Sequence, residues 1–202
     1  RSWDVVVMHG YSTLDIDHPG DPALLVASAK QMTDLFRARN PKADVWLTAT
    51  WSRADQTYPD GKPWHGKPIQ QMGKDIAAAY GAAAANARAT GVVPMGLAWN
   101  RAIDTGFADD NPYDGIAPGK INLWTHDSYH ASAYGYYLEA LLVSGFGHGQ
   151  LQTPCRRDTG SPKTLSGRHS IVIRALIVLT GSQDQWPERD VENPMTRVQA
   201  QR

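Results

Sequence analysis

The chain has 202 residues, the length of a single domain with enough sequence to bury a hydrophobic core. Its composition, 42% hydrophobic and 20% charged, is typical of a globular protein. The 20 basic and 20 acidic residues leave a formal net charge of zero, which argues against a broad binding surface for nucleic acid or for an anionic membrane. No apolar run reaches the roughly 18 residues that a membrane-spanning helix requires.

The first half of the chain predicts strands that alternate with helices. Val5–Met8 are four apolar residues, and such a run predicts a buried parallel strand that is apolar on both faces. A helix is expected to start at Asp21, a helix-capping residue followed by a proline, and to end at Asn40, which precedes another proline. Residues 45–47 predict the next short strand.

The alternation continues through the second half. Residues 52–68 are rich in Pro, Gly, Asp and Lys, which predicts a surface loop of a length that is often functional. Pro94 places the strand predicted at 92–95 at a sheet edge or a strand end, because proline lacks the N–H that pairing needs. The other predicted elements are helices at 69–90, 98–105 and 131–146, a polar loop at 107–120 and a short apolar strand at 120–124.

This order of elements predicts an α/β domain over residues 1–146, with a parallel sheet and helices on both of its faces. In such sheets ligands bind beyond the carboxyl ends of the strands. Three polar and aromatic segments follow predicted strands at that edge: residues 9–12, residues 50–53, and Asp127 with His130. We expect these segments to lie close together.

The remaining residues, 147–202, differ from the domain in their pattern of apolar and polar residues. Residues 148–168 show little apolar periodicity, residues 171–179 predict one strand, and residues 182–202 are polar. We interpret this stretch as a tail that is disordered or that results from a shift of reading frame near residue 147.

Asp127 and His130 form the most informative pattern in the chain. They lie between a predicted strand and a predicted helix, where a carboxylate can orient the imidazole and stabilise its positive charge. The imidazole can then take a proton from a nucleophile. The positive end of the helix dipole favours an ionised carboxylate and a neutral histidine at this position. The alternative interpretation is a surface turn in which Asp127 only caps the helix.

A zinc-dependent hydrolase is another alternative, through His126 and His130. Two histidines four residues apart with an acid between them resemble the metalloprotease pattern. That site requires both histidines on one face of a helix, whereas residues 120–124 predict a strand, and Asp127 stands where the pattern has glutamate. No third ligand is evident. We therefore expect no metal and no other cofactor.

Gly10 and Ser12 follow the first predicted strand. A glycine at the carboxyl end of a strand lets the backbone approach a ligand, and the Ser12 side chain can donate a hydrogen bond to an oxyanion. The simpler interpretation of both residues is a strand-to-loop turn.

The segment Asp127-Ser-Tyr-His130-Ala-Ser-Ala-Tyr-Gly135 resembles the last conserved block of the SGNH (GDSL-type) hydrolases. In that family an Asp-x-x-His element before the final helix supplies two members of a Ser-His-Asp triad. The segment Gly10-Tyr-Ser12-Thr resembles the block that usually reads Gly-x-Asn-Asp, with Ser12 where the oxyanion-hole asparagine normally stands. The resemblance covers residues 3–146.

This resemblance implies a three-layer α/β/α domain with a flavodoxin-like parallel sheet, and an ester hydrolase that needs no cofactor. His130 would be the general base and Asp127 would orient it, while Gly10 and Ser12 would contact the oxyanion or the substrate. The substrate would be a small ester or an acylated carbohydrate. No nucleic acid partner and no membrane span are expected.

The sequence departs from the family at its start. No Gly-Asp-Ser motif precedes Trp3, and the second, glycine-containing block of the family is absent. Because an apolar strand follows Arg1 within a few residues, we expect a domain truncated at its amino end, with the nucleophilic serine upstream. If the chain were active by itself, Ser12 or Ser52 would have to be the nucleophile.

A domain that binds a carbohydrate or another ligand without catalysis is the remaining alternative. It would use Trp51, Trp64 and Trp99 as walls of a binding cleft. On the hydrolase interpretation, Trp99 is expected in the core together with Tyr136 and Tyr137. The sequence does not indicate a cellular compartment or an oligomeric state.

Overall fold

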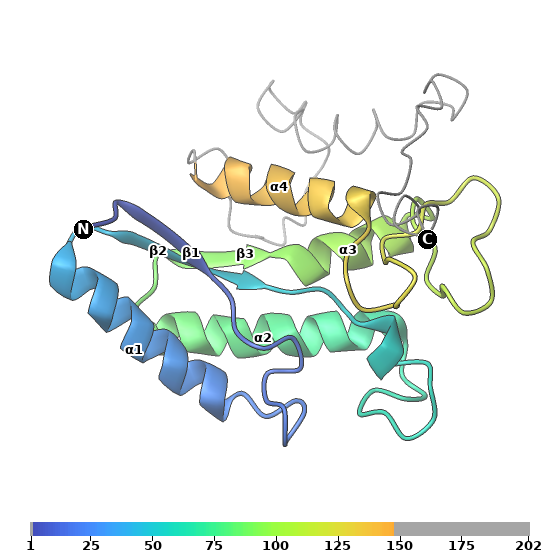
Figure 1. The fold of residues 1–202 in the computed structure, drawn as a ribbon, viewed down its shortest axis with the longest axis horizontal. Coiled ribbons are helices and arrows are strands. Elements are labelled where there is room, and N and C mark those ends of the chain that lie inside the picture. Colours follow the sequence, from blue (N-terminus) through green and yellow to red (C-terminus); the bar gives the residue numbers. More distant parts are fainter. Residues whose placement is uncertain (1, 148–202) are drawn as a thin grey trace, which may run out of the picture. The chain divides into compact units, whose positions relative to one another are not determined.

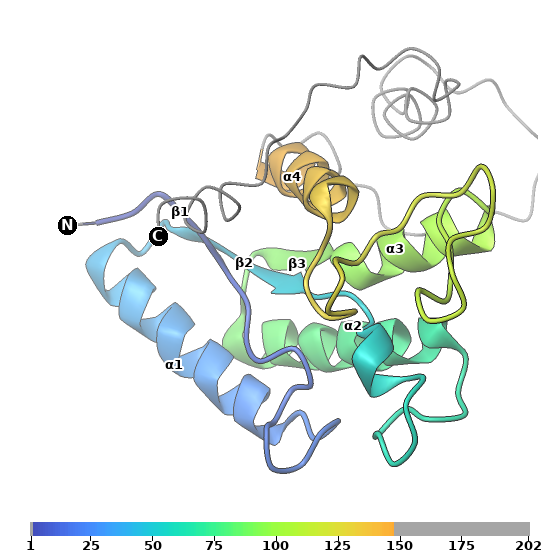
Figure 2. The same cartoon turned by 45° about the vertical axis from the view of Figure 1, so that its right-hand side comes forward.

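The computed structural model describes residues 2–147, which Figures 1 and 2 show in two views. The elements are β1 (Val5–Met8), α1 (Ala23–Arg39), β2 (Asp44–Ala49), the short 3-10 helix η1 (Ala54–Gln56), α2 (Ile69–Ala87), β3 (Gly91–Pro94), α3 (Met95–Asp104) and α4 (Ala133–Gly147). None of the helices in this part of the chain is long and apolar enough to cross a membrane. The predicted tail and its strand at 171–179 lie outside the described residues.

The three strands form a parallel sheet with β2 in the centre. Val6 of β1 lies opposite Val45 of β2, and Leu47 of β2 lies opposite Val92 of β3. Figures 1 and 2 show α1 and α2 on one side of this sheet and α4 on the other. The predicted α/β class with a parallel sheet is therefore confirmed for the described residues, with three strands and four α-helices.

β2 and β3 match their predictions. On one face of β2, Val45, Leu47 and Ala49 are 0%, 1% and 0% exposed, and on the other face Trp46 and Thr48 are 9% and 2% exposed. This is expected of a parallel strand covered on both faces. Pro94 is the last residue of β3, at a strand end as predicted. The prediction that Pro94 lies at a sheet edge or at the end of its strand is therefore confirmed.

β1 departs from its predicted burial. Val5 and Val7 are 49% and 44% exposed, so the prediction of a strand buried on both faces is wrong. Val5 and Val7 lie on the same face of β1, and residues 2–147 leave this face open at the edge strand of the sheet. An apolar run identifies a strand, but it does not say whether the strand is central.

On the first side of the sheet, α1 begins and ends near its predicted bounds, whereas α2 begins at Ile69 as predicted but ends at Ala87, before the predicted end at residue 90. The Asp21 side chain accepts the backbone N–H of Ala23 at 2.8 Å, and α1 ends at Arg39. In α2, the residues Met72, Ile76, Tyr80 and Ala83 recur at helical spacing and are all 0% exposed. This stripe forms the centre of the core on that side of the sheet.

Close backbone contact fixes the segment that follows β2. A Cβ atom on Gly96 of α3 would lie 2.4 Å from the backbone oxygen of Thr50 and 3.4 Å from the Cα of Gly73 in α2. Because backbone atoms cannot yield as a flexible side chain does, position 96 accepts only glycine. The contact holds the end of β2 between α2 and α3.

Residues 120–124 do not form the predicted strand. The segment makes only isolated bridges, Ala108 with Ile121 and Trp124 with Ala131. Leu123 and Trp124 are each 1% exposed, so the apolar run fills the core as an extended segment without continuous sheet neighbours. A short apolar run does not distinguish these two states.

The aromatic residues of α3 and α4 divide between core and surface. Trp99 is 1% exposed, as predicted, whereas Tyr136 and Tyr137 are 48% and 50% exposed, so their predicted burial is wrong. Leu138 and Leu142 form the buried face of α4. Helical spacing turns the two tyrosines away from that face.

Tyr80 ties α2 to the loop after β1. Its side chain is buried, and its hydroxyl oxygen accepts the backbone N–H of Gly10 at 2.7 Å. Burial raises the pKa of Tyr80 to about 12, although the hydrogen bond from Gly10 acts in the opposite direction. The loop that contains Ser12 thus starts at a fixed point in the core.

Tyr80→Phe is expected to lower the free energy of unfolding by about 1 kcal/mol at pH 7, because Gly10 loses its acceptor. The raised folded-state pKa means that the neutral phenol stabilises the fold fully below its unfolded pKa of about 10. This stability is lost as the pH rises towards 12, so the variant should lose less stability in alkali. Urea unfolding at neutral and alkaline pH measures both effects.

Tyr113→Phe is the matched control, because Tyr113 is 53% exposed. Equal changes in the two variants would contradict the anchoring role of Tyr80.

Candidate active site

A tight turn from Thr125 to His130 presents the two predicted residues. The Oδ1 atom of Asp127 accepts the Thr125 hydroxyl at 2.6 Å and the backbone N–H groups of Tyr129 and His130 at 3.0 and 2.9 Å. The backbone N–H of Thr125 closes the turn by donating to the His130 carbonyl at 2.8 Å. Ser128 has a left-handed φ of 57°, which costs a residue other than glycine about 1 kcal/mol.

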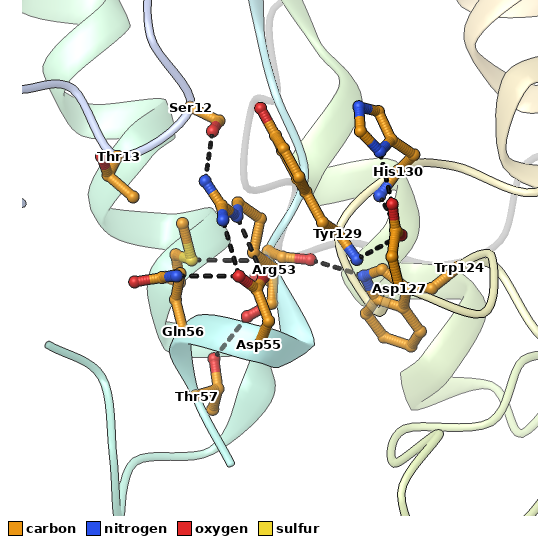
Figure 3. A network of polar contacts seen from close by, with 12 residues as sticks. Ser12, Thr13, Arg53, Asp55, Gln56, Thr57, Trp124, Asp127, Tyr129 and His130 are labelled. Carbon is orange, nitrogen blue, oxygen red and sulfur yellow. Dashed lines mark hydrogen bonds and ion pairs between the residues drawn. The ribbon is translucent and has the colours of Figure 1, made fainter. Parts of the chain in front are cut away.

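The other carboxylate oxygen of Asp127 orients the histidine, as Figure 3 shows. The Nδ1 atom of His130 lies 2.6 Å from Oδ2. Hydrogen bonds from His130, from Thr125 and from the Tyr129 backbone hold the pKa of Asp127 well below its usual range. An ionised carboxylate only accepts, so Nδ1 carries a hydrogen, and in the neutral imidazole Nε2 is the proton acceptor, on a side chain that is 56% exposed.

Two tryptophans fix this turn against the end of β2. The Trp51 indole N–H donates to the carbonyl of Tyr129 at 3.0 Å, and the Trp124 indole N–H donates to the carbonyl of Ser52 at 2.9 Å. Trp51 also stacks on the buried ring of Trp99, with ring centroids 5.0 Å apart. The turn is therefore held by hydrogen bonds from side chains that are themselves packed.

Arg53 belongs to one of the three segments that the sequence places at the carboxyl edge of the sheet, and it contacts the other two. Its Nε and Nη2 atoms donate to the two oxygens of Asp55 at 3.0 and 2.6 Å. Its Nη1 atom donates to the Ser12 hydroxyl oxygen at 3.1 Å, and its guanidinium carbon lies 3.6 Å from the centre of the Tyr129 ring. The predicted gathering of these segments is therefore confirmed.

The charge of Arg53 is stabilised by its partner. Burial lowers the pKa of Arg53, but the hydrogen bonds and the negative charge of Asp55 outweigh this effect and raise the pKa above its ordinary value. The bidentate geometry also orients the guanidinium plane. Arg53 is thus a fixed cation.

The ring of Tyr129 lies between Arg53 and His130 (Figure 3). The Tyr129 and His130 ring centroids are 4.2 Å apart, at an interplanar angle of 33°. One aromatic ring therefore separates the cation from the imidazole.

The structure places Gly10 and Ser12 in different roles. The N–H of Gly10 is bound to Tyr80, and a Cβ atom at this position would lie 2.9 Å from Cδ1 of Leu25. The backbone N–H of Gly10 is therefore used within the fold. Ser12 belongs to the polar site, because its hydroxyl oxygen accepts from Arg53.

Neither candidate serine of this chain is joined to the base. Ser52 is 1% exposed, and its hydroxyl oxygen accepts the backbone N–H of Gly73 at 2.7 Å. Ser12 contacts Arg53. Within residues 2–147, no serine hydroxyl is hydrogen-bonded to the His130 ring.

The geometry does not favour the zinc alternative. Residues 126–130 form a turn, so His126 and His130 do not share a helix face. The Nδ1 atom of His130 is already bound to Asp127. In the described part of the chain, no three His, Cys, Asp or Glu side chains are grouped so that they could hold a metal ion.

The proposed aromatic cleft of a binding domain is also disfavoured. Trp64 and Trp99 are 3% and 1% exposed, so neither can form the wall of a cleft. The Trp64 indole N–H is bound to Asp75 at 2.9 Å. Of the three tryptophans, Trp51 alone is only partly buried.

The sequence did not single out Asp55 and Tyr129 as site residues, and it placed Arg53 there only as part of residues 50–53. The available signal was an arginine four residues after the end of a strand, with an acid two residues later. That spacing permits the bidentate ion pair, but it does not predict the contact with the Tyr129 ring.

No known protein family matches the chain, and no curated protein matches it. Among solved structures it is similar to the crystal structure of a DUF4886 family protein from Bacteroides uniformis ATCC 8492. The TM-score is 0.53 at 19% sequence identity, and the alignment covers 88% of this chain and 61% of that chain. At this identity the likeness shows a shared α/β fold alone. The chain spans less than two thirds of the length of that structure.

Thr125→Val is expected to raise the pKa of Asp127, because it removes a donor to the ionised carboxylate. Asp127 has a depressed folded-state pKa, so it stabilises the turn above the ordinary carboxyl pKa of about 3.9. This stabilisation is lost as the pH falls through the depressed value. The variant should therefore open its turn at a higher pH than the unmodified protein.

The backbone amide shifts of Tyr129 and His130, followed by NMR during acid titration, measure this opening. Thr105→Val removes a hydroxyl at the end of α3 and serves as the control. Identical titrations of all three proteins would show that Thr125 does not act on Asp127.

Proposed function

We propose that the protein is an ester hydrolase of the SGNH type, in which His130 is the general base and Asp127 orients it. One observation carries this proposal: the 2.6 Å contact between Nδ1 of His130 and Asp127, on an imidazole that is 56% exposed. A general base needs a fixed orientation and an accessible, unprotonated nitrogen. The resemblance of residues 127–135 to the family's last block supports the same assignment.

In the proposed reaction, Nε2 of His130 takes the proton of a nucleophilic serine as the serine oxygen attacks the ester carbonyl. Asp127 stabilises the imidazolium that forms. The proton then passes to the leaving alcohol, and water hydrolyses the acyl-enzyme with the same base. The family resemblance assigns the serine to a Gly-Asp-Ser block upstream of Trp3, since neither Ser12 nor Ser52 contacts His130.

The finer fold that accompanies this proposal is the three-layer, flavodoxin-like arrangement of the SGNH family. The parallel sheet and the helices on its two sides support it. The substrate belongs to the carboxylic esters.

His130→Ala is expected to lower kcat for p-nitrophenyl acetate in the complete enzyme by about 10⁶-fold. Asp127→Asn should lower it by about 10⁴-fold, because the imidazole loses its orientation and its tautomer. His18→Ala, at a side chain that is 79% exposed, should leave kcat unchanged. Initial rates of nitrophenol release measure all three variants.

A fluorophosphonate probe locates the nucleophile independently. It is expected to label a serine of the complete enzyme outside residues 2–147, and His130→Ala should abolish the labelling. Full activity in His130→Ala, or a probe attached to Ser12 or Ser52, would overturn the assignment.

A further inference from the structure

Arg53 and Ser12 carry hydrogen-bond donors that find no acceptor in residues 2–147. A guanidinium has five N–H groups, and the contacts with Asp55 and Ser12 use one each on Nε, Nη2 and Nη1. One N–H on Nη1 and one on Nη2 remain. The hydroxyl hydrogen of Ser12 is a third donor, because its oxygen is the acceptor in the contact with Arg53.

The two Arg53 donors cannot simply turn towards water, whereas Ser12 is only partly buried. Arg53 is 8% exposed, and the bidentate contact with Asp55 and the stacked ring of Tyr129 fix its plane. Asp55 is itself occupied, since it also accepts the side-chain amide of Gln56 at 2.8 Å. Buried donors without acceptors cost free energy, so this fixed set is suited to an acceptor that comes from outside the chain.

The position of the donors separates them from the oxyanion of the proposed reaction. That oxyanion forms beside the serine that His130 activates, within direct reach of the imidazole. The Arg53 guanidinium lies across the Tyr129 ring from His130, 3.6 Å from the ring centre. The donors are therefore placed for a second group of the same substrate.

We propose that Arg53 and Ser12 bind a free carboxylate of the substrate, so that the enzyme acts on esters that also carry a carboxylate. The remaining edge of the planar guanidinium matches two carboxylate oxygens, and the Ser12 hydroxyl supplies another donor. Half-esters of dicarboxylic acids and sugar acids that are acylated on a hydroxyl group have this chemistry. That the substrate is an ester rests on the proposed function. The carboxylate site itself is inferred only from the free hydrogen-bond donors of Arg53 and Ser12.

Binding of acetate to the chain tests the site without turnover. Acetate is expected to shift the Tyr129 amide and the Trp51 indole N–H signals in NMR spectra to saturation, and uncharged acetamide should not. Arg53→Lys keeps the charge but loses the planar fork, and it should weaken acetate binding at least tenfold. Ser12→Ala leaves the ion pair intact and should weaken binding about fivefold.

Arg101→Met is the control, because Arg101 is an exposed cation on α3 and its loss should leave acetate binding unchanged. Acetate shifts that persist in both Arg53→Lys and Ser12→Ala would overturn the site. Tighter binding of inorganic phosphate than of acetate would overturn its assignment to a carboxylate.

Kinetics of the complete enzyme separate this inference from the proposed function. Monomethyl succinate is expected to have at least a tenfold higher kcat/KM than dimethyl succinate, and Ser12→Ala should reduce that preference. Equal hydrolysis of both esters would refute the carboxylate site and leave the esterase function standing. Acetate binding at Arg53 without hydrolysis of either ester would refute the esterase function and leave the site standing.

Discussion

The ion pair between Arg53 and Asp55 is the contact on which the polar site depends. It fixes a guanidinium that also reaches Ser12 after β1 and the ring of Tyr129 in the turn before α4. Because the side chain of Arg53 is largely shielded from solvent, salt screens these contacts less than it screens surface ion pairs. Loss of Asp55 would leave a buried cation without its partner, which costs more than the pair contributes when intact.

Asp127 couples the shape of the turn to the orientation of the base. Its Oδ1 atom holds the backbone of the turn, while its Oδ2 atom holds the imidazole of His130. A single ionised group therefore performs both tasks. The left-handed conformation of Ser128 between the two residues is tolerated because these hydrogen bonds over-determine the backbone.

The sequence predicted what depends on local spacing. Asp127 and His130 are three residues apart, so their contact follows from one turn, and the stripe from Met72 to Ala83 follows from helical periodicity. The exposed face of β1 could not be predicted, because it depends on where the strand lies in the sheet and on which parts of the chain cover that face. Residues 120–124 had the composition of a strand, but their apolar side chains fill the core without strand neighbours.

The contact between Arg53 and Tyr129 could not be predicted from the sequence for a related reason. It joins two loops far apart in the chain, and their meeting depends on how the end of β2 is held between α2 and α3. That close approach requires glycine at position 96. A long-range contact of this kind has no periodic or local signal in one sequence.

The backbone of Tyr129 is bound on both sides, since its N–H donates to Asp127 and its carbonyl accepts from Trp51. Neither contact involves the phenol ring. Evolution can therefore exchange the side chain at position 129 without disturbing the backbone that presents His130. Substitutions at this position would therefore change the surface beside Asp127 and His130 while the geometry of that pair is inherited unchanged.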